Sequence, residues 1–300
     1  MKKAIIEMGT NSTRLLIAEK NGSKINVIDK ALITTRLGEG VDSNKLLNKE
    51  AIKRGLHAID SFQRKIDKHD VQSVKIIGTS ALRDVNNSQE LIQRIKDAFG
   101  YELKIITGKK EAVLTYKGVS QDLDLSNYII IDIGGGSTEI ICQDNQQELK
   151  TFSVNIGAVR LADRFIKNKE GTLSKSVIEK ISIYINNEFK KCLDIKPGTN
   201  NLIGVGGTIT SAASIMLKLK DYEPNVIHNY TLKYSDINRI LNILRKLELN
   251  KRKKVKGLNP HRADIILPGL IILIEVMKCL RTLHLRVSEH DILYGLLVDE

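Results

Sequence analysis

The chain is 300 residues long, which gives room for one large domain or two modest ones. Hydrophobic residues make up 42% and charged residues 27% of it, a composition that excludes a largely disordered chain. A net charge of +12 suits an anionic partner, whereas 4% aromatic residues and no Trp argue against stacking on unpaired bases. The three cysteines contain no CxxC motif, which excludes a disulfide framework and a cysteine-rich zinc site.

The sequence contains no segment that predicts secretion or membrane insertion. Few apolar residues follow Met1-Lys2-Lys3, fewer than the roughly 7–15 of a secretory signal. The most apolar stretch, 265–277, is shorter than the ~20 residues of a membrane span and contains Pro268 and Glu275. We therefore expect a buried core helix in this stretch. We also expect a cytoplasmic protein that does not contact membranes. A homodimer is possible.

The first part of the chain predicts strands and helices in alternation. Two short apolar runs flank a Gly-Thr-Asn-Ser turn, a pattern typical of a hairpin. Apolar residues between Leu46 and Ile66 recur at steps of three and four, which predicts an amphipathic helix. The expected elements are strands at 4–6, 15–18, 25–28, 32–35, 74–78 and 103–106, and helices at 46–66, 87–99 and 111–118.

The same alternation then starts again. Ser174 is the expected cap of one helix, and Gly206-Gly207-Thr208 opens another. The expected elements are strands at 128–133, 138–142 and 202–205, and helices at 177–189, 208–217, 237–247, 263–283 and 290–298. Two such sets predict an α/β protein with two sheets.

A short segment of the chain is repeated. Residues 7–14, Glu-Met-Gly-Thr-Asn-Ser-Thr-Arg, correspond to residues 132–139, Asp-Ile-Gly-Gly-Gly-Ser-Thr-Glu, without a gap. Both read acid-x-Gly-x-x-Ser-Thr between apolar runs. The repeat indicates duplicated domains that hold a ligand between them, although two tight hairpins would also use such glycines.

These loops have the composition of phosphate cradles. Glycine lets backbone N–H groups approach an anion closely, and Ser12 and Ser137 add hydroxyl donors. The acids that precede the loops, Glu7 and Asp132, suit Mg²⁺, which prefers one or two carboxylates together with phosphate oxygens. A third loop, 204–208, leads from a strand into a helix and is a further candidate anion seat. No P-loop, GxGxxG, HExxH or GxSxG motif is present, which disfavours the enzyme classes that use them.

Seven motifs in order give the chain a family resemblance. They are Gly9-Thr-Asn-Ser-x-Arg-Leu, Thr79-Ser-Ala-Leu-Arg-Asp, Gly108-x-x-Glu-Ala, Asp132-Ile-Gly-Gly-Gly-Ser-Thr-Glu, Gly157-Ala-Val-Arg-Leu, Gly206-Gly-Thr and Arg262-Ala-Asp…Pro268-Gly. Together they resemble the exopolyphosphatase/guanosine pentaphosphate phosphohydrolase (Ppx/GppA) family, over nearly the whole chain and in its short, two-domain form.

The resemblance implies a fold of two actin/hexokinase-like (ribonuclease H-like) α/β lobes with an interlobe cleft. The expected N-terminal lobe is 1–118 together with a C-terminal helix at about 286–300, and the expected C-terminal lobe is 119–285.

The resemblance also implies an activity and a set of site residues. The expected reaction removes a terminal phosphate from inorganic polyphosphate, or from the 5′ end of guanosine pentaphosphate, with Mg²⁺. Glu111 is implied as the base that activates water, and Glu139 acts at the metal and reaction centre. The metal ligands are expected to be Asp132 and Glu139, with help from Glu7. Phosphate is expected to contact Gly9, Thr10, Asn11, Ser12, Arg83, Gly134, Gly135, Gly136, Ser137, Gly206, Gly207 and Thr208.

Two positions depart from the family pattern. The family usually has Asp where Glu7 stands, and the extra methylene moves the carboxylate by roughly an ångström at a metal with strict geometry. Glu7 would then bind through water, shift the metal preference or weaken activity. The segment 288–295 lacks the usual Arg-Glu pair of the last motif.

The basic run 251–256 has two possible interpretations. Such runs are usually solvated loops, and the functional alternative is a surface that binds a long polyanion. No nucleic-acid-binding motif accompanies the run, so we expect no specific nucleic acid. The alternatives to an exopolyphosphatase are a pppGpp 5′-phosphohydrolase or dual enzyme, a weakly catalytic polyphosphate- or nucleotide-binding sensor, and a kinase of the same superfamily.

Overall fold

The computed structural model describes residues 1–300 except 23, 124, 126–127, 144–147, 193–200 and 300. Contacts within the chain divide it into two compact units, Met1–Asp122 with His290–Glu300 and Leu123–Glu289. The domain bounds expected from the sequence stay a prediction, because compactness alone does not test whether a segment folds independently.

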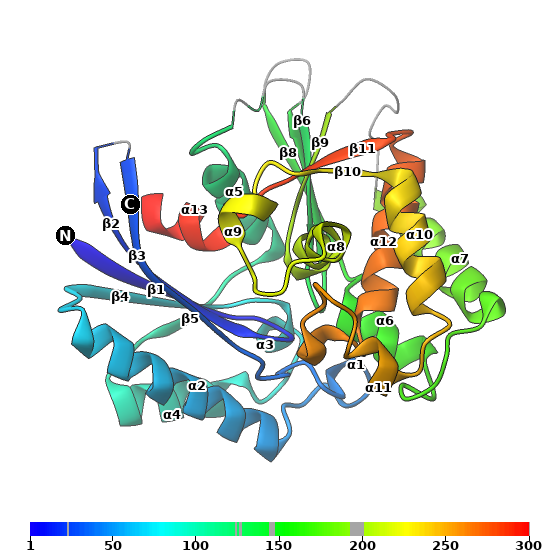
Figure 1. Ribbon diagram of the computed structural model, residues 1–300. Helices are drawn as coiled ribbons and strands as arrows, with labels where there is room; N and C mark the ends of the chain where they lie inside the picture. The colour runs from blue at the N-terminus through cyan, green and yellow to red at the C-terminus, as the bar shows by residue number, and fades with distance from the viewer. Residues whose placement is uncertain (23, 124, 126–127, 144–147, 193–200, 300) are drawn as a thin grey trace. The chain divides into compact units, whose positions relative to one another are not determined.

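The first unit is a mixed sheet covered on both faces (Figure 1). The strand order is β3-β2-β1-β4-β5; β1 is antiparallel to β2 and parallel to β4. Its strands are β1 Lys2–Met8, β2 Thr13–Asn21, β3 Lys24–Ile33, β4 Ser73–Gly78 and β5 Leu103–Ile105. Its helices are α1 Val41–Asn44, α2 Lys49–Lys68, α3 Ser80–Arg83, α4 Ser88–Phe99, α5 Gly108–Val119 and α13 Ile292–Val298.

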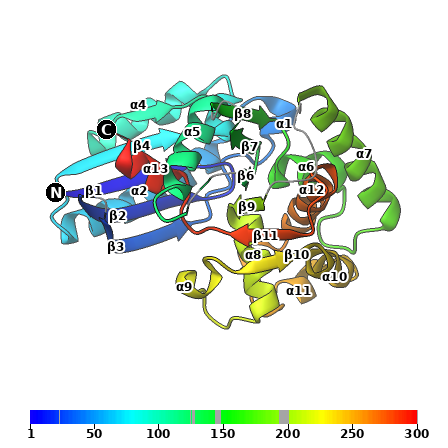
Figure 2. The ribbon, with the colours of Figure 1, turned by 90° about the horizontal axis from the view of Figure 1, so that it is seen from above.

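Alternation along β1 and β2 decides which helices cover which side chains. Ala4 and Ile6 pack into the core that contains residues of α2 and α4. Ile5 and Leu16 point to the opposite face and pack with residues of α5 and α13. Glu7 and Arg14 have the same parity as Ile5 and Leu16, so they lie on the face that α5 and α13 cover. Figures 1 and 2 show α13 against this sheet.

The second unit repeats this topology with an added strand. Its order is β10-β11-β9-β6-β7-β8, in which β6 is antiparallel to β7 and parallel to β9. Its strands are β6 Tyr128–Ile133, β7 Thr138–Gln143, β8 Leu149–Val154, β9 Asn201–Val205, β10 Thr231–Lys233 and β11 His284–Val287. Its helices are α6 Ala158–Phe165, α7 Lys175–Cys192, α8 Gly207–Leu217, α9 Pro224–Ile227, α10 Tyr234–Leu244, α11 Leu249–Arg252, a 3₁₀ turn Pro260–Arg262 and α12 Ile266–Cys279.

Two α/β sheets are therefore confirmed, and the repeated loops stand at equivalent turns, β1–β2 and β6–β7. Several element bounds differ from the expectation. The strands expected at 25–28 and 32–35 are one strand, β3. The apolar helix expected at 263–283 ends at Cys279, and left-handed Arg281 reverses the chain into β11.

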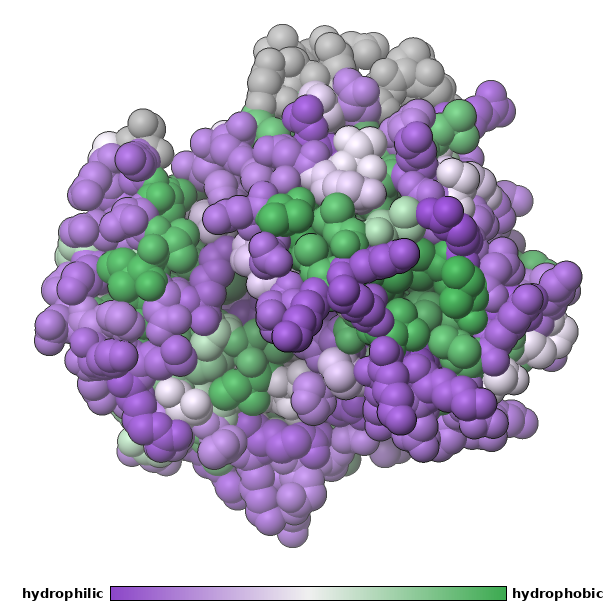
Figure 3. Space-filling view, in the orientation of Figure 1, coloured by the Kyte–Doolittle hydropathy of each residue, from purple (hydrophilic) through white to green (hydrophobic). Residues whose placement is uncertain are grey.

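No described helix is long and apolar enough to cross a membrane. On the face shown in Figure 3, hydrophilic residues predominate and apolar residues form separate areas.

Candidate functional site

The first glycine loop, 9–12, is closed by its own backbone and fastened by a neighbouring segment. Gly9 N–H donates to the Ser12 carbonyl at 3.0 Å. The Thr10 carbonyl accepts from Gly38 N–H at 2.8 Å and the Asn11 carbonyl from Arg36 N–H at 2.9 Å.

The second loop, 134–137, has the same closure. Gly134 N–H donates to the Ser137 carbonyl at 3.0 Å, and the Gly134 and Gly135 carbonyls accept from the first backbone N–H groups of α6. The Gly136 carbonyl accepts from Nε of buried Arg160 at 2.8 Å. The loop carbonyls thus satisfy donors that a helix N-terminus otherwise leaves unpaired.

These contacts fix the direction of the loop N–H groups. The described peptide bonds are trans, so each N–H points away from the carbonyl of the residue before it. Because the carbonyls of 134–136 face α6, the N–H groups of Gly135, Gly136 and Ser137 face the other way. The N–H groups of Asn11 and Ser12 likewise face away from the 36–38 segment. Consecutive N–H groups of this kind form an anion-binding concavity.

The third loop meets the second at the ends of two parallel strands. Asp132 on β6 is the register partner of Val205 on β9, which leads into Gly206. A Cβ on Gly206 would lie 2.7 Å from Asp132 Oδ1, and the φ of +93° also favours glycine there. The Asp132 carboxylate therefore lies against the backbone that opens α8.

The acidic residues that precede the two repeated loops face partners on the neighbouring strand whose charges differ in sign. Glu7 faces Arg14 across β1 and β2, whereas Asp132 faces Glu139 across β6 and β7. Glu139 is fully buried, and its Oε1 accepts from the Ser153 hydroxyl at 2.8 Å.

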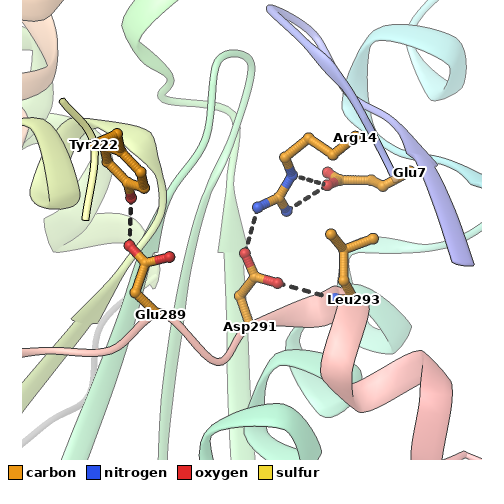
Figure 4. A network of polar contacts seen from close by, with 6 residues as sticks. All are labelled: Glu7, Arg14, Tyr222, Glu289, Asp291 and Leu293. Atoms are coloured by element: carbon orange, nitrogen blue, oxygen red, sulfur yellow. Dashed lines mark hydrogen bonds and ion pairs between the residues drawn. The ribbon is translucent and has the colours of Figure 1, made fainter. Parts of the chain in front are cut away.

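Arg14 is held between two carboxylates (Figure 4). Its Nε donates to Glu7 Oε2 at 2.7 Å, its Nη2 donates to the same oxygen, and its Nη1 donates to Asp291 Oδ2. Asp291 also caps α13, because its Oδ1 accepts from Leu293 N–H at 3.0 Å. Burial opposes the guanidinium charge, but Asp291 and Glu7 outweigh it and raise the pKa of Arg14.

Glu111 stands in the first turn of α5, whose cap is the Thr107 hydroxyl. It is 7% exposed, and its Oε2 accepts from Arg83 Nη1 at 3.1 Å. The same Nη1 donates to the Ile106 carbonyl at 2.9 Å, which fixes the guanidinium. Burial raises the pKa of Glu111 to about 7; Arg83 opposes the shift and Glu7 adds to it.

Several polar side chains expected at phosphate have partners within their own unit. The Thr10 hydroxyl bonds to the Ser80 hydroxyl at 2.8 Å, and Asn11 Nδ2 donates to Ser12 Oγ at 3.1 Å. The Thr208 hydroxyl lies 2.3 Å from where a Cβ on Gly269 would stand. In these loops the backbone N–H groups are thus better placed for an anion than the side chains are.

Sequence reasoning assigned no role to three groups that the structure brings into these sites. The Arg262 guanidinium lies on Gly207, where a Cβ would be 2.1 Å from it. Tyr222 donates to Glu289 near the start of α8, also seen in Figure 4. The third is Asp291, which binds Arg14; the repeat shows only that Arg14 stands where Glu139 stands in the second copy, and nothing in it indicates Asp291.

The candidate residues thus form two sets, one in each unit. Glu7, the loop 9–12, Arg83 and Glu111 belong to the first unit, and the remaining candidates belong to the second. Among the described residues no group of three or more His, Cys, Asp or Glu side chains is arranged to hold a metal ion.

Known proteins that are similar to this chain match it over nearly its whole length. The model of the Ppx/GppA phosphatase family matches residues 16–300. A bifunctional 3-dehydroquinate synthase/phosphatase of Fusobacterium nucleatum is 36% identical over 99% of this chain, which spans 46% of that protein. Exopolyphosphatase 2 of Mycobacterium tuberculosis is 29% identical over 98% of this chain and 96% of its own length.

Two further relatives extend the comparison. A guanosine-5′-triphosphate,3′-diphosphate pyrophosphatase of Vibrio atlanticus is 27% identical over 92% of this chain and 54% of its own length. The crystal structure of an exopolyphosphatase from Cytophaga hutchinsonii is similar with a TM-score of 0.89 at 28% identity, covering 99% of this chain and 96% of that one.

Proposed function

Because the chain belongs to the Ppx/GppA phosphatase family, hydrolases of phosphoanhydride bonds, we propose that it is an exopolyphosphatase. It would release terminal orthophosphate from inorganic polyphosphate by attack of water that Glu111 activates.

The observation that carries the proposal is the environment of Glu111. Burial brings its pKa to about 7, so near neutral pH the side chain can both accept and release a proton. Arg83 holds one carboxylate oxygen and so orients the group. A water molecule bonded to Glu111 would pass a proton to it as the water oxygen bonds to the terminal phosphorus. The bond between that phosphorus and the bridging oxygen breaks, so the terminal unit becomes orthophosphate and the shortened polyphosphate leaves with the bridging oxygen.

The glycine loops would bind the phosphates. Phosphoryl transfer depends on alignment and charge neutralisation, which rigid backbone donors supply. The N–H groups of Gly135, Gly136 and Ser137 are directed by contacts with α6, and the start of α8 adds a helix N-terminus.

The residues of the second unit fit a magnesium ion. Asp132 and Glu139 face each other on neighbouring strands, where Cβ atoms are about 4.5–5.5 Å apart. Two carboxylates without a full protein cage suit Mg²⁺, which keeps water and phosphate oxygens as ligands. Bound there, Mg²⁺ would neutralise negative charge on the substrate.

Two observations favour polyphosphate as the substrate. Lys251, Lys253, Lys254 and Lys256 are all exposed, and hydrophilic side chains cover α11 in Figure 3. The M. tuberculosis exopolyphosphatase is 29% identical over 98% of this chain, compared with 27% over 92% for the V. atlanticus pyrophosphatase. Hydrolysis of guanosine pentaphosphate, alone or as a second activity, is the alternative that the latter relative supports. We further propose a cytoplasmic location.

The test is phosphate release by the purified chain with Mg²⁺, from long-chain polyphosphate and from guanosine pentaphosphate at equal concentrations of phosphate ends. Faster release from polyphosphate supports the proposal, and faster release from the nucleotide replaces it with the alternative. Tight binding of either compound without release would favour a sensor.

A further inference from the structure

Arg14 stands at the position of the first repeat that corresponds to Glu139, a proposed metal ligand, in the second repeat. The acid before the second loop, Asp132, faces a second acid, and the acid before the first loop, Glu7, faces Arg14. A second carboxylate, that of Asp291 in the C-terminal segment, also accepts a hydrogen bond from the Arg14 guanidinium. Two carboxylates therefore converge in the first unit as well, with a positive charge already between them.

The guanidinium fills this position closely. The side chains of Glu7 and Asp291 are 11% and 10% exposed, and Arg14 is 25% exposed. Nε and Nη2 donate to one carboxylate and Nη1 to the other, so three of its five N–H groups are directed at these two acids. Arg14 remains charged at all working pH values, so its charge is fixed in place.

We propose that Arg14 is the resident cation of the first glycine loop and prevents Glu7 from binding a divalent ion. The inference concerns the same reaction as the proposed function, but its test requires no substrate. Divalent-ion binding would then belong to Asp132 and Glu139 alone. Arg14 and Asp291 would act as positioning residues that hold the Glu7 carboxylate beside the loop 9–12.

Removal of the guanidinium should convert this position into an ion site. In R14Q the carboxylates of Glu7 and Asp291 would face each other without a positive charge, and a hard divalent cation is the natural replacement. R14K is the matched control, because it keeps a positive charge at the position.

The experiment measures Mn²⁺ bound to the substrate-free protein, by the electron paramagnetic resonance signal of free Mn²⁺. We expect D132N to lose the ion that the wild type binds and E7Q to retain it. R14Q should bind one additional ion, which R14Q/D291N loses and R14K never gains. Mn²⁺ should also raise the melting temperature of R14Q more than that of the wild type, since binding stabilises the folded state.

Two results would overturn the inference. One is an E7Q protein that loses the wild-type ion, which would make Glu7 a ligand in the presence of Arg14. The other is a folded R14Q protein, by circular dichroism, that binds no additional ion. Neither result bears on whether the wild type hydrolyses polyphosphate, so failure of the inference is separable from failure of the proposed function.

Discussion

Glu111 and Arg83 come from different helices and meet at 3.1 Å in a partly buried position of the first unit. Arg83 ends the short helix α3 after β4, and Glu111 lies in the first turn of α5 after β5. The parallel pairing of β4 with β5 brings these two strand ends together. A carboxylate fixed by a guanidinium and raised in pKa by burial is suited to proton transfer.

The E111Q substitution should lower the rate of phosphate release by about 10²–10⁴-fold. Glutamine keeps the shape of the side chain but cannot accept a proton, and loss of a general base typically costs about 10²–10⁴-fold in rate. Steady-state phosphate release measures the effect. Exposed Glu102, on the same unit, provides the control E102Q, which should retain the wild-type rate. A fully active E111Q enzyme would remove Glu111 from the mechanism.

The rate should also depend on pH in a direction set by Glu111. The base works as a carboxylate, so kcat/KM should rise as the pH increases through about 7, the pKa to which burial raises this group. The residual rate of E111Q should show no such rise. A wild-type profile that is flat between pH 6 and 8 would contradict the assignment.

Stability should change with pH in the opposite direction. The folded pKa of Glu111, about 7, lies above the ordinary value of 4.5, so between these values the folded state binds more protons. The contribution of this group to stability is therefore full below about pH 4.5 and declines as the pH rises toward 7, by on the order of 3 kcal/mol. E111Q should remove that part of the decline, as measured by urea unfolding at several pH values. An unchanged pH dependence would show that Glu111 titrates normally.

The sequence predicted the repeated loops and the alternation of elements well, because glycine turns and apolar periodicity are local signals. The sequence did not predict those elements and contacts that depend on residues far apart in the chain. The strand β11 follows directly on the stretch 263–283 expected as one helix, and no element was expected at 284–287; there the chain pairs with β9 and β10. The link between Arg14 and Asp291 spans 277 positions and depends on α13 packing against α5, which no local pattern contains.

The G157A substitution should impair the second glycine loop. A Cβ at this position would lie 2.3 Å from the Gly135 carbonyl oxygen, and the backbone there cannot move without releasing its contacts to α6. We expect a loss of about 1–3 kcal/mol in stability, typical of overpacking, and at least a tenfold fall in kcat/KM for polyphosphate. Thermal unfolding and phosphate release measure the two effects.

Gly171 offers the control for this substitution. A Cβ there would lie 3.1 Å from Nδ2 of the exposed Asn168 side chain, which needs to shift by only a few tenths of an ångström. G171A should therefore keep the wild-type kcat/KM. Equal losses in both variants would show that the second loop has no special need for glycine at 157.

The exposed lysines of the basic run should contribute to binding of long polyphosphate. Each lysine that contacts a polyanion releases condensed counterions, and for single strands of nucleic acid the slope of log K against log salt is about −0.7 per contact. Neutralising Lys251, Lys253, Lys254 and Lys256 should therefore make the slope for polyphosphate shallower by up to about 3. The control neutralises four exposed lysines of the first unit, Lys49, Lys53, Lys68 and Lys104, and should leave the slope unchanged. Equal slopes in all proteins would make the run an ordinary solvated surface.

Arg252 should behave differently from the lysines beside it. It is 2% exposed, and its guanidinium donates to the carbonyls of Leu244, Leu247, Gly171 and Ala263. R252Q removes most of these donors, and each buried carbonyl left without a partner costs about 1–3 kcal/mol. We expect a marked fall in the urea midpoint with little change in the salt dependence of polyphosphate binding. A stable R252Q protein with a shallower salt slope would instead place Arg252 at the polyanion, because only a guanidinium that reaches the surface can release counterions.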